Sequence, residues 1–322
     1  MSDKVRIAVI GAGKMANSVH YPSLQTLDDV EVVGICDLFP ELLHATADKY
    51  GIRNRYTDYR QMIGETNPQA VYAIGQPHIM YDIWMWCLER GVNLYIEKPL
   101  GLSIHQARAL AYVAEKNRCI TQVSFQRRNS PLAVKLREEC LKRGPITHAV
   151  CRFYKSGMVP FLGARDRMMD DTVHAIDTIR WMCGGNVVKV ESTTKRVGVP
   201  DLNFVSATLS FDNGSHGYLL NSFSSGRRIF SVEMHAPNIC AEAELETRGY
   251  LYADGDYTGV AYDAREVAGS NEKFIYGGFQ PKHREFIDCL KEGTQPSSNF
   301  QDALKTMEVA ETILAQAQLT GS

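Results

Sequence analysis

The sequence lacks the features that mark several large classes of protein. None of its apolar runs approaches the length of about 20 residues that a membrane-spanning helix needs. Its eight cysteines stand singly, with no Cys-x-x-Cys pair, which argues against a zinc knuckle or a thioredoxin-type motif. The charges nearly cancel to a net −2, so nothing favours nucleic acid or an anionic membrane as a partner.

A secretory signal is not expected either. Such a signal needs a basic start and an apolar stretch before the fold begins, whereas here a strand pattern follows the first four residues. We therefore expect a cytoplasmic protein, in which a disulfide framework is improbable. The 322 residues are enough for one large domain or two ordinary ones, and 44% hydrophobic with 22% charged residues is typical of a globular chain.

The most informative stretch is the first strand and the turn after it. The apolar run at 5–10 leads into Gly11-x-Gly13-x-x-Ala16, with Lys14 and Met15 inside the turn. In the dinucleotide-binding fingerprint, the first glycine permits the tight turn and the second lets a pyrophosphate approach the backbone. A helix expected at 17–27 would then direct its N-terminus toward the anion. An ordinary strand-to-helix turn is the alternative.

Asp37 ends a second predicted strand at 31–36. It follows the glycine turn at close to the separation of about 20 residues expected for an acid that binds the ribose hydroxyls. A carboxylate there accepts hydrogen bonds from both hydroxyls of NAD and repels the extra phosphate of NADP, so we predict NAD as the cofactor. The alternative is a turn or helix-capping aspartate before Pro40.

Two further strand ends point to the same crevice, because ligands of open parallel sheets bind outside the carboxyl ends of the strands. A strand at 70–74 leads to Gln76 and Pro77, which we expect to touch the cofactor. A strand at 93–96 leads to Glu97-Lys98-Pro99. The ammonium of Lys98 can bind a substrate oxygen and favour negative charge there. Pro99 permits a cis peptide bond.

A predicted helix at 166–181 carries a third group of polar residues. Asp170 and His174 are four residues apart and so share a face, and Asp177 falls near the same stripe. Histidine titrates near neutrality, which suits proton transfer coupled to hydride transfer. The alternative is a buried histidine in an amphipathic helix. A metal site is less favoured, because no second histidine or cysteine stands at a ligand spacing.

From residue 146 the pattern changes to long alternating segments with turn signals such as Asn213-Gly214, typical of hairpins. We therefore predict an α/β protein with two domains: a Rossmann domain at 1–124, and an α+β domain at 125–322 with a large, mostly antiparallel open sheet.

The glycine turn, Glu97-Lys98-Pro99 and Asp170-x-x-x-His174-x-x-Asp177 occur together in the order and spacing of one family. The chain resembles the glucose–fructose oxidoreductase / inositol dehydrogenase (Gfo/Idh/MocA) family of NAD(P)-dependent sugar and polyol oxidoreductases. The resemblance implies a homodimer or homotetramer formed through the free face of the second sheet. It also implies that substrate is contacted by residues at the domain junction and the site rim, with Arg127, Arg128 and His283 as candidates beside Asp177.

The function predicted on this basis is hydride transfer between NAD and a secondary alcohol of a sugar, sugar derivative or cyclitol. Lys98, His174 and Asp170 are the expected catalytic residues. Two alternatives stay open: a non-catalytic regulator that binds dinucleotide, and an enzyme that retains NAD in a net non-redox reaction such as glycoside cleavage. One departure from the family pattern is Tyr81, where members often have a histidine.

Overall fold

The computed structural model describes residues 4–163 and 165–319, which divide into two compact units. Unit 1 runs to Ser124 and includes Phe279–Leu304, whereas unit 2 comprises Phe125–Gly278 and the residues from Lys305 onward. The first division falls where the sequence placed the domain boundary. The assignment of all of 125–322 to the second domain needs a correction, because the segment Phe279–Leu304 packs with the first unit.

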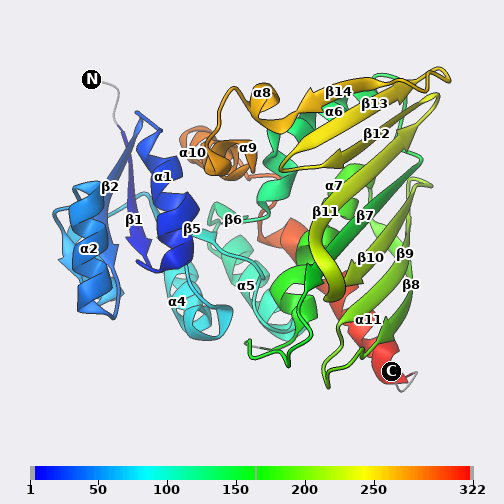
Figure 1. The fold of residues 1–322 in the computed structure, drawn as a ribbon. Helices are drawn as coiled ribbons and strands as arrows, with labels where there is room; N and C mark the ends of the chain where they lie inside the picture. The colour runs from blue at the N-terminus through cyan, green and yellow to red at the C-terminus, as the bar shows by residue number, and fades with distance from the viewer. Residues whose placement is uncertain (1–3, 164, 320–322) are drawn as a thin grey trace. The chain divides into compact units, whose positions relative to one another are not determined.

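Unit 1 is built on a six-stranded sheet in which every neighbouring pair is parallel, in the order β3-β2-β1-β4-β5-β6 (Figure 1). Apart from the two-residue edge strand β3, its strands are mostly buried, as expected when helices cover both faces of a parallel sheet. The strands are β1 (Val5–Ile10), β2 (Val30–Cys36), β3 (Arg55–Tyr56), β4 (Ala70–Ala73), β5 (Asn93–Ile96) and β6 (Thr121–Val123).

The helices of unit 1 follow the strands alternately, which confirms the Rossmann prediction. They are η1 (Ala16–His20), α1 (Tyr21–Gln25), α2 (Pro40–Tyr50), α3 (Tyr59–Thr66), α4 (Pro77–Glu89), α5 (Ile104–Lys116) and, from the returning segment, α10 (Phe279–Glu292). The predicted first helix forms as a π-helical turn, η1, that continues into α1. Pro22 lies just beyond this turn, and in a regular α-helix it would lack a donor for the carbonyl of Ser18 and clash with it.

Unit 2 contains an eight-stranded sheet in the order β14-β13-β12-β11-β7-β10-β9-β8, whose strands are all antiparallel except the β7–β10 pair. This confirms the predicted mostly antiparallel sheet. The strands are β7 (His148–Ser156), β8 (Val187–Lys195), β9 (Phe204–Phe211), β10 (His216–Ser222), β11 (Ser224–Ala236), β12 (Ile239–Glu244), β13 (Arg248–Ala253) and β14 (Val260–Asp263).

Helices cover one face of this sheet: α7 packs on β7 and β10, and α6 on β11 and β12 (Figure 1). Burial therefore alternates along the strands, with exposed His216, Tyr218 and Leu220 on the open face of β10. The helices are η2 (Gln126–Asn129), α6 (Pro131–Leu141), η3 (Met168–Thr172), α7 (Val173–Cys183), α8 (Ala264–Ala268), α9 (Lys273–Tyr276) and most of α11 (Phe300–Leu319). Among the helices that the structure describes, none combines the length and the hydropathy needed to cross a bilayer.

Candidate functional site

The glycine turn lies tightly against the neighbouring strand of unit 1. Gly11 has a φ of +113°, and a Cβ at this position would stand 2.1 Å from the carbonyl oxygen of Ile74. Both the backbone conformation and the space therefore require glycine here. The phenolic group of Tyr21 donates to the carbonyl oxygen of Gly11 at 3.2 Å, which ties the turn to α1.

The other end of the turn is open. Gly13, Lys14 and Met15 are exposed, and a Cβ built on Gly13 would meet no heavy atom within 4 Å. Gly13 is thus not needed for packing, in contrast to Gly11. An uncovered glycine at the start of a helix is what a pyrophosphate requires, because the group must approach the backbone N–H groups closely. The residues present therefore fit a dinucleotide.

This contrast gives a prediction about Gly13. We expect Gly13→Ala to unfold at the same temperature as the parent protein and to bind NADH at least about tenfold more weakly, because the added methyl group occupies the space of the pyrophosphate. Gly11→Ala should instead lower the unfolding temperature, since its methyl group collides with the sheet. Thermal unfolding and NADH fluorescence titration measure the two effects. Unchanged NADH binding by Gly13→Ala would place the pyrophosphate elsewhere.

Asp37, at the end of β2, contacts the turn directly. Its Oδ2 accepts a hydrogen bond from the N–H of Ala12 at 2.7 Å, and its Oδ1 accepts one from the N–H of Phe39 at 2.9 Å. The side chain is half-buried. Asp37 thus makes the turn-stabilising contacts that were the alternative to ribose binding. It also lies beside the glycine turn, where a ribose-binding acid must lie. The ribose contact itself stays a prediction.

The remaining predicted cofactor residues lie at the same edge of the sheet. Because β1, β4 and β5 are adjacent and parallel, their carboxyl ends place the glycine turn, Gln76 and Lys98 along one edge. Gln76 is exposed and precedes Pro77, the first residue of α4. Glu97 is buried, Lys98 is half-buried, and the Lys98–Pro99 peptide bond is cis.

In unit 2 the predicted catalytic helix begins with a π-helical turn. Asp170 is half-buried in η3, and His174 follows in the first turn of α7 with 9% of its surface exposed. The ring of Phe125 meets the imidazole of His174 edge to face at 6.1 Å. The neighbouring Asp171 forms an ion pair with Lys155. Among residues 4–163 and 165–319, no three histidine, cysteine or acidic side chains are grouped as a metal site requires.

Asp177, one of the predicted substrate candidates, forms a buried ion pair. It is 1% exposed, and its two oxygens accept hydrogen bonds from the Nε and Nη2 of Arg128, the former at 2.7 Å. Thr306 donates to the same carboxylate at 3.3 Å. The pair is buried and anchors η2 to α7, which argues against Asp177 and Arg128 as substrate candidates.

Arg127 differs from its neighbour, although it is also buried. Its guanidinium lies 3.6 Å from the ring centre of Phe230 and 3.8 Å from the carboxylate of Glu246. Burial lowers the pKa of Arg127 to about 10, and Glu246 acts in the opposite direction. Its Nε has no hydrogen-bond partner among the described residues. Of the arginine pair, Arg127 is the one that retains hydrogen-bonding capacity for a ligand.

His283, predicted as a substrate candidate at the site rim, has no exposed surface. It is fully buried inside unit 1, where its Nε2 lies 3.0 Å from the Nδ1 of His20. The Nε2 of His20 lies 2.8 Å from the carboxylate of Glu97. No local pattern could reveal this chain of contacts, because its members are separated by up to 263 residues.

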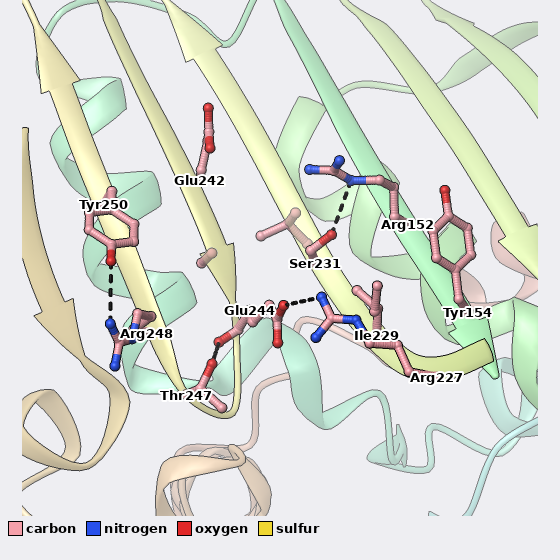
Figure 2. A pocket seen from close by; sticks show the side chains of 12 residues that line it. Arg152, Tyr154, Arg227, Ile229, Ser231, Glu242, Glu244, Thr247, Arg248 and Tyr250 are labelled. Carbon is pink, nitrogen blue, oxygen red and sulfur yellow. Dashed lines mark hydrogen bonds and ion pairs between the residues drawn. The ribbon is translucent and has the colours of Figure 1, made fainter. Parts of the chain in front are cut away.

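The open face of the unit 2 sheet carries a groove of about 460 Å³ over β7, β11, β12 and β13. Its lining includes three arginines and two glutamates, and Figure 2 shows each of the arginines interacting with a neighbouring side chain. Arg152 donates to Ser231 at 3.1 Å, and Arg227 forms an ion pair with Glu244 at 3.3 Å. None of the predicted catalytic, cofactor or substrate residues lines this groove.

Comparisons with known proteins agree with this architecture. Residues 5–125 match a family described as "Oxidoreductase family, NAD-binding Rossmann fold", and residues 144–236 match "GFO/IDH/MocA C-terminal domain". The chain is 26% identical to the D-glucoside 3-dehydrogenase of Escherichia coli K12 over 84% of this chain and 85% of that protein. It is 24% identical to the myo-inositol 2-dehydrogenase of Thermotoga maritima over 92% of each.

The fold is also similar to that of solved structures. A dehydrogenase from Chromobacterium violaceum superposes with a TM-score of 0.89 at 18% identity, covering 99% of this chain and 97% of that one. At this identity the likeness bears on the fold, and it extends over both units.

Proposed function

Because the chain belongs to the Gfo/Idh/MocA family of oxidoreductases, we propose that it transfers hydride between NAD and a secondary alcohol of a sugar, sugar derivative or cyclitol. The observation that carries this proposal is the edge of the unit 1 sheet. There the open glycine turn, the carboxylate of Asp37 and the half-buried Lys98 follow strands β1, β2 and β5 of one parallel sheet. The substrate class is supported by the two curated relatives, which are named for a glucoside and an inositol.

The cofactor we propose is NAD, held by Gly11, Gly13, Lys14, Met15, Asp37, Gln76, Pro77, Glu97 and Lys98. When bound, the nicotinamide would accept or supply the hydride. The N–H groups at the open end of the turn are suited to the pyrophosphate, and the carboxylate of Asp37 to the ribose hydroxyls. Asp37 carries a negative charge that would repel the additional phosphate of NADP. The residues immediately after it, Leu38 and Phe39, offer no cation in exchange.

The reaction then needs two groups of this chain. The ammonium of Lys98 binds the alcohol oxygen and stabilises the negative charge that develops on it. The imidazole of His174 takes the hydroxyl proton as hydride leaves the carbon. Asp170, one helical turn before His174, orients the ring or the substrate. Arg127 is the remaining substrate candidate, through the hydrogen-bonding capacity that its buried guanidinium retains.

The assay that tests this proposal mixes the protein with a panel of sugars and cyclitols and either NAD or NADP. We expect reduced cofactor to accumulate with at least one member of the panel, and faster with NAD. Absorbance of the reduced nicotinamide measures it. Cofactor binding without turnover on a wide panel would favour a regulator, and product release without net reduced cofactor would favour a non-redox reaction. Preference for NADP would contradict the role of Asp37.

We also propose that the chain forms a homo-oligomer through the open face of the unit 2 sheet. The support is the amphipathic sheet itself: helices cover one face, whereas the other exposes Tyr218 and Leu220. The same open face carries the groove of Figure 2, whose arginines and acids are suited to pairing with a copy of the same surface.

A further inference from the structure

Three residues far apart in the sequence form one buried chain of hydrogen bonds in unit 1. His20 is the last residue of η1, Glu97 directly follows β5, and His283 lies in the first turns of α10. The two histidines are fully buried, and Glu97 is 8% exposed. The contact between the imidazoles measures 3.0 Å, and that from His20 to the carboxylate measures 2.8 Å. The helix after the glycine turn is thereby joined to the residue before Lys98.

Aromatic rings enclose this chain. The imidazole of His283 stacks on Tyr95 with ring centres 4.8 Å apart and on Tyr72 at 5.2 Å. Tyr95 donates to Ser124 at 3.0 Å. Lys282 precedes His283 in the same helix and forms an ion pair with Glu285 at 2.9 Å, and its charge acts on His283. The titratable groups that face the two imidazoles are therefore Glu97, these two tyrosines and Lys282.

The hydrogen-bonding capacity of each atom sets the direction of the chain. An ionised carboxylate only accepts, so the Nε2 of His20 carries a proton and donates to Glu97. The Nδ1 of His283 has no partner among the described residues, and a buried N–H without an acceptor is costly. We therefore assign the proton of His283 to Nε2, which donates to the Nδ1 of His20. Burial, with His20 and Lys282, lowers the pKa of His283 well below its ordinary value, which agrees with a neutral ring.

We propose that His20 and His283 are positioning residues for Lys98: two neutral imidazoles in series hold the carboxylate of Glu97 and so fix the turn that carries the lysine. Because the carboxylate has little access to water, losing its donor leaves a buried charge without compensation, and the turn must move to hydrate it. This inference rests on the proposed function, since it takes Lys98 to act on the substrate. The role of the histidine at the end of η1 is then to donate a hydrogen bond to Glu97.

The test compares three variants by the acetylation rate of Lys98, followed by mass spectrometry with Lys116 as the internal reference. His20→Leu removes both hydrogen bonds and fills the space. His20→Gln keeps a side-chain N–H that can reach Glu97. Ile287→Val is the matched control, because Ile287 is a fully buried core residue of the same helix as His283 and has no side-chain hydrogen-bonding group. NADH binding is titrated for each variant.

We expect Lys98 of His20→Leu to be acetylated about tenfold faster, because the turn opens locally once its buried anchor is lost. His20→Gln should recover most of the protection. With a substrate from the panel, kcat of His20→Leu should fall by about 10²-fold with little change in KM, as for a misplaced catalytic group.

Equal acetylation rates in His20→Leu and Ile287→Val would overturn the proposal, as would failure of His20→Gln to restore protection. Neither result depends on turnover. If instead Lys98→Ala keeps the turnover of the parent protein while the acetylation rates differ as expected, the proposed function fails and the anchoring of the turn stands.

Discussion

Replacing Lys98 or His174 by alanine is expected to lower kcat by at least about 10²-fold with the substrate that the panel identifies. Lys98→Ala removes the cation that stabilises developing negative charge on the alcohol oxygen. His174→Ala removes the proton acceptor. Steady-state kinetics measure both, and NADH titration shows whether the cofactor still binds. The control is Lys116→Ala, an exposed lysine in the last turn of α5, which should keep the turnover of the parent protein.

The two variants differ in their dependence on pH. Alcohol oxidation requires a neutral imidazole as the proton acceptor, so turnover of the parent protein should fall once the pH is low enough to protonate His174. His174→Ala should lose this decline along with its activity, whereas Lys98→Ala should keep it. A His174→Ala profile that matches the parent protein in height and shape would exclude this histidine as the base.

Much of the fold follows from local patterns in the sequence. The strand, the glycine turn and the acid at the end of β2 are close together in the chain, and the structure brings Asp37 to the N–H of Ala12 as that spacing implies. Alternation of apolar residues identified the strands of unit 2 because one face of that sheet packs on helices. Such features depend on neighbours along the chain, so a single sequence is enough to find them.

The contacts that the sequence did not reveal all join distant segments. The segment Phe279–Leu304 returns to unit 1, and no composition change near residue 279 signals it. Arg128 and Asp177 are 49 residues apart, so the sequence did not show that they pair, and each was predicted as a substrate candidate.

The π-helical turns η1 and η3 were predicted as ordinary helix. The periodicity of the apolar residues does not distinguish a π-helical turn from an α-helix.

The buried Arg128–Asp177 pair leads to the second prediction of a large effect. Arg128→Met should lower the free energy of unfolding of unit 2 by about 3–5 kcal/mol, because the carboxylate of Asp177 would remain buried without its guanidinium. Asp177→Asn should have a similar effect through the unpaired arginine. A loss of this size is a large part of the 5–15 kcal/mol by which proteins are commonly stable. Denaturant dependence of hydrogen exchange in α7 peptides measures it.

A matched control lies in the same unit. Arg143 and Asp254 form the same two-point arrangement, at 3.0 and 2.6 Å, but both side chains are about half exposed. Water compensates for the loss of such a pair, so Arg143→Met should change stability by only about 0–1 kcal/mol. The double variant Arg128→Met with Asp177→Leu should recover much of the loss, since replacing both ions by apolar groups removes the uncompensated charge.

The stabilities of these variants decide whether Arg128 stabilises the fold or binds a substrate. If Arg128→Met proves no more destabilising than Arg143→Met, water must reach the carboxylate of Asp177, and the arginine would then be free to bind a substrate as the family resemblance implied. The double variant could instead be as unstable as Arg128→Met. In that case η2 and α7 are held together by the hydrogen bond from Thr306 to Asp177 and by the volume of the pair, and not by charge compensation. A large loss that the double variant reverses assigns the pair to the fold, and leaves Arg127 as the arginine of η2 available to substrate.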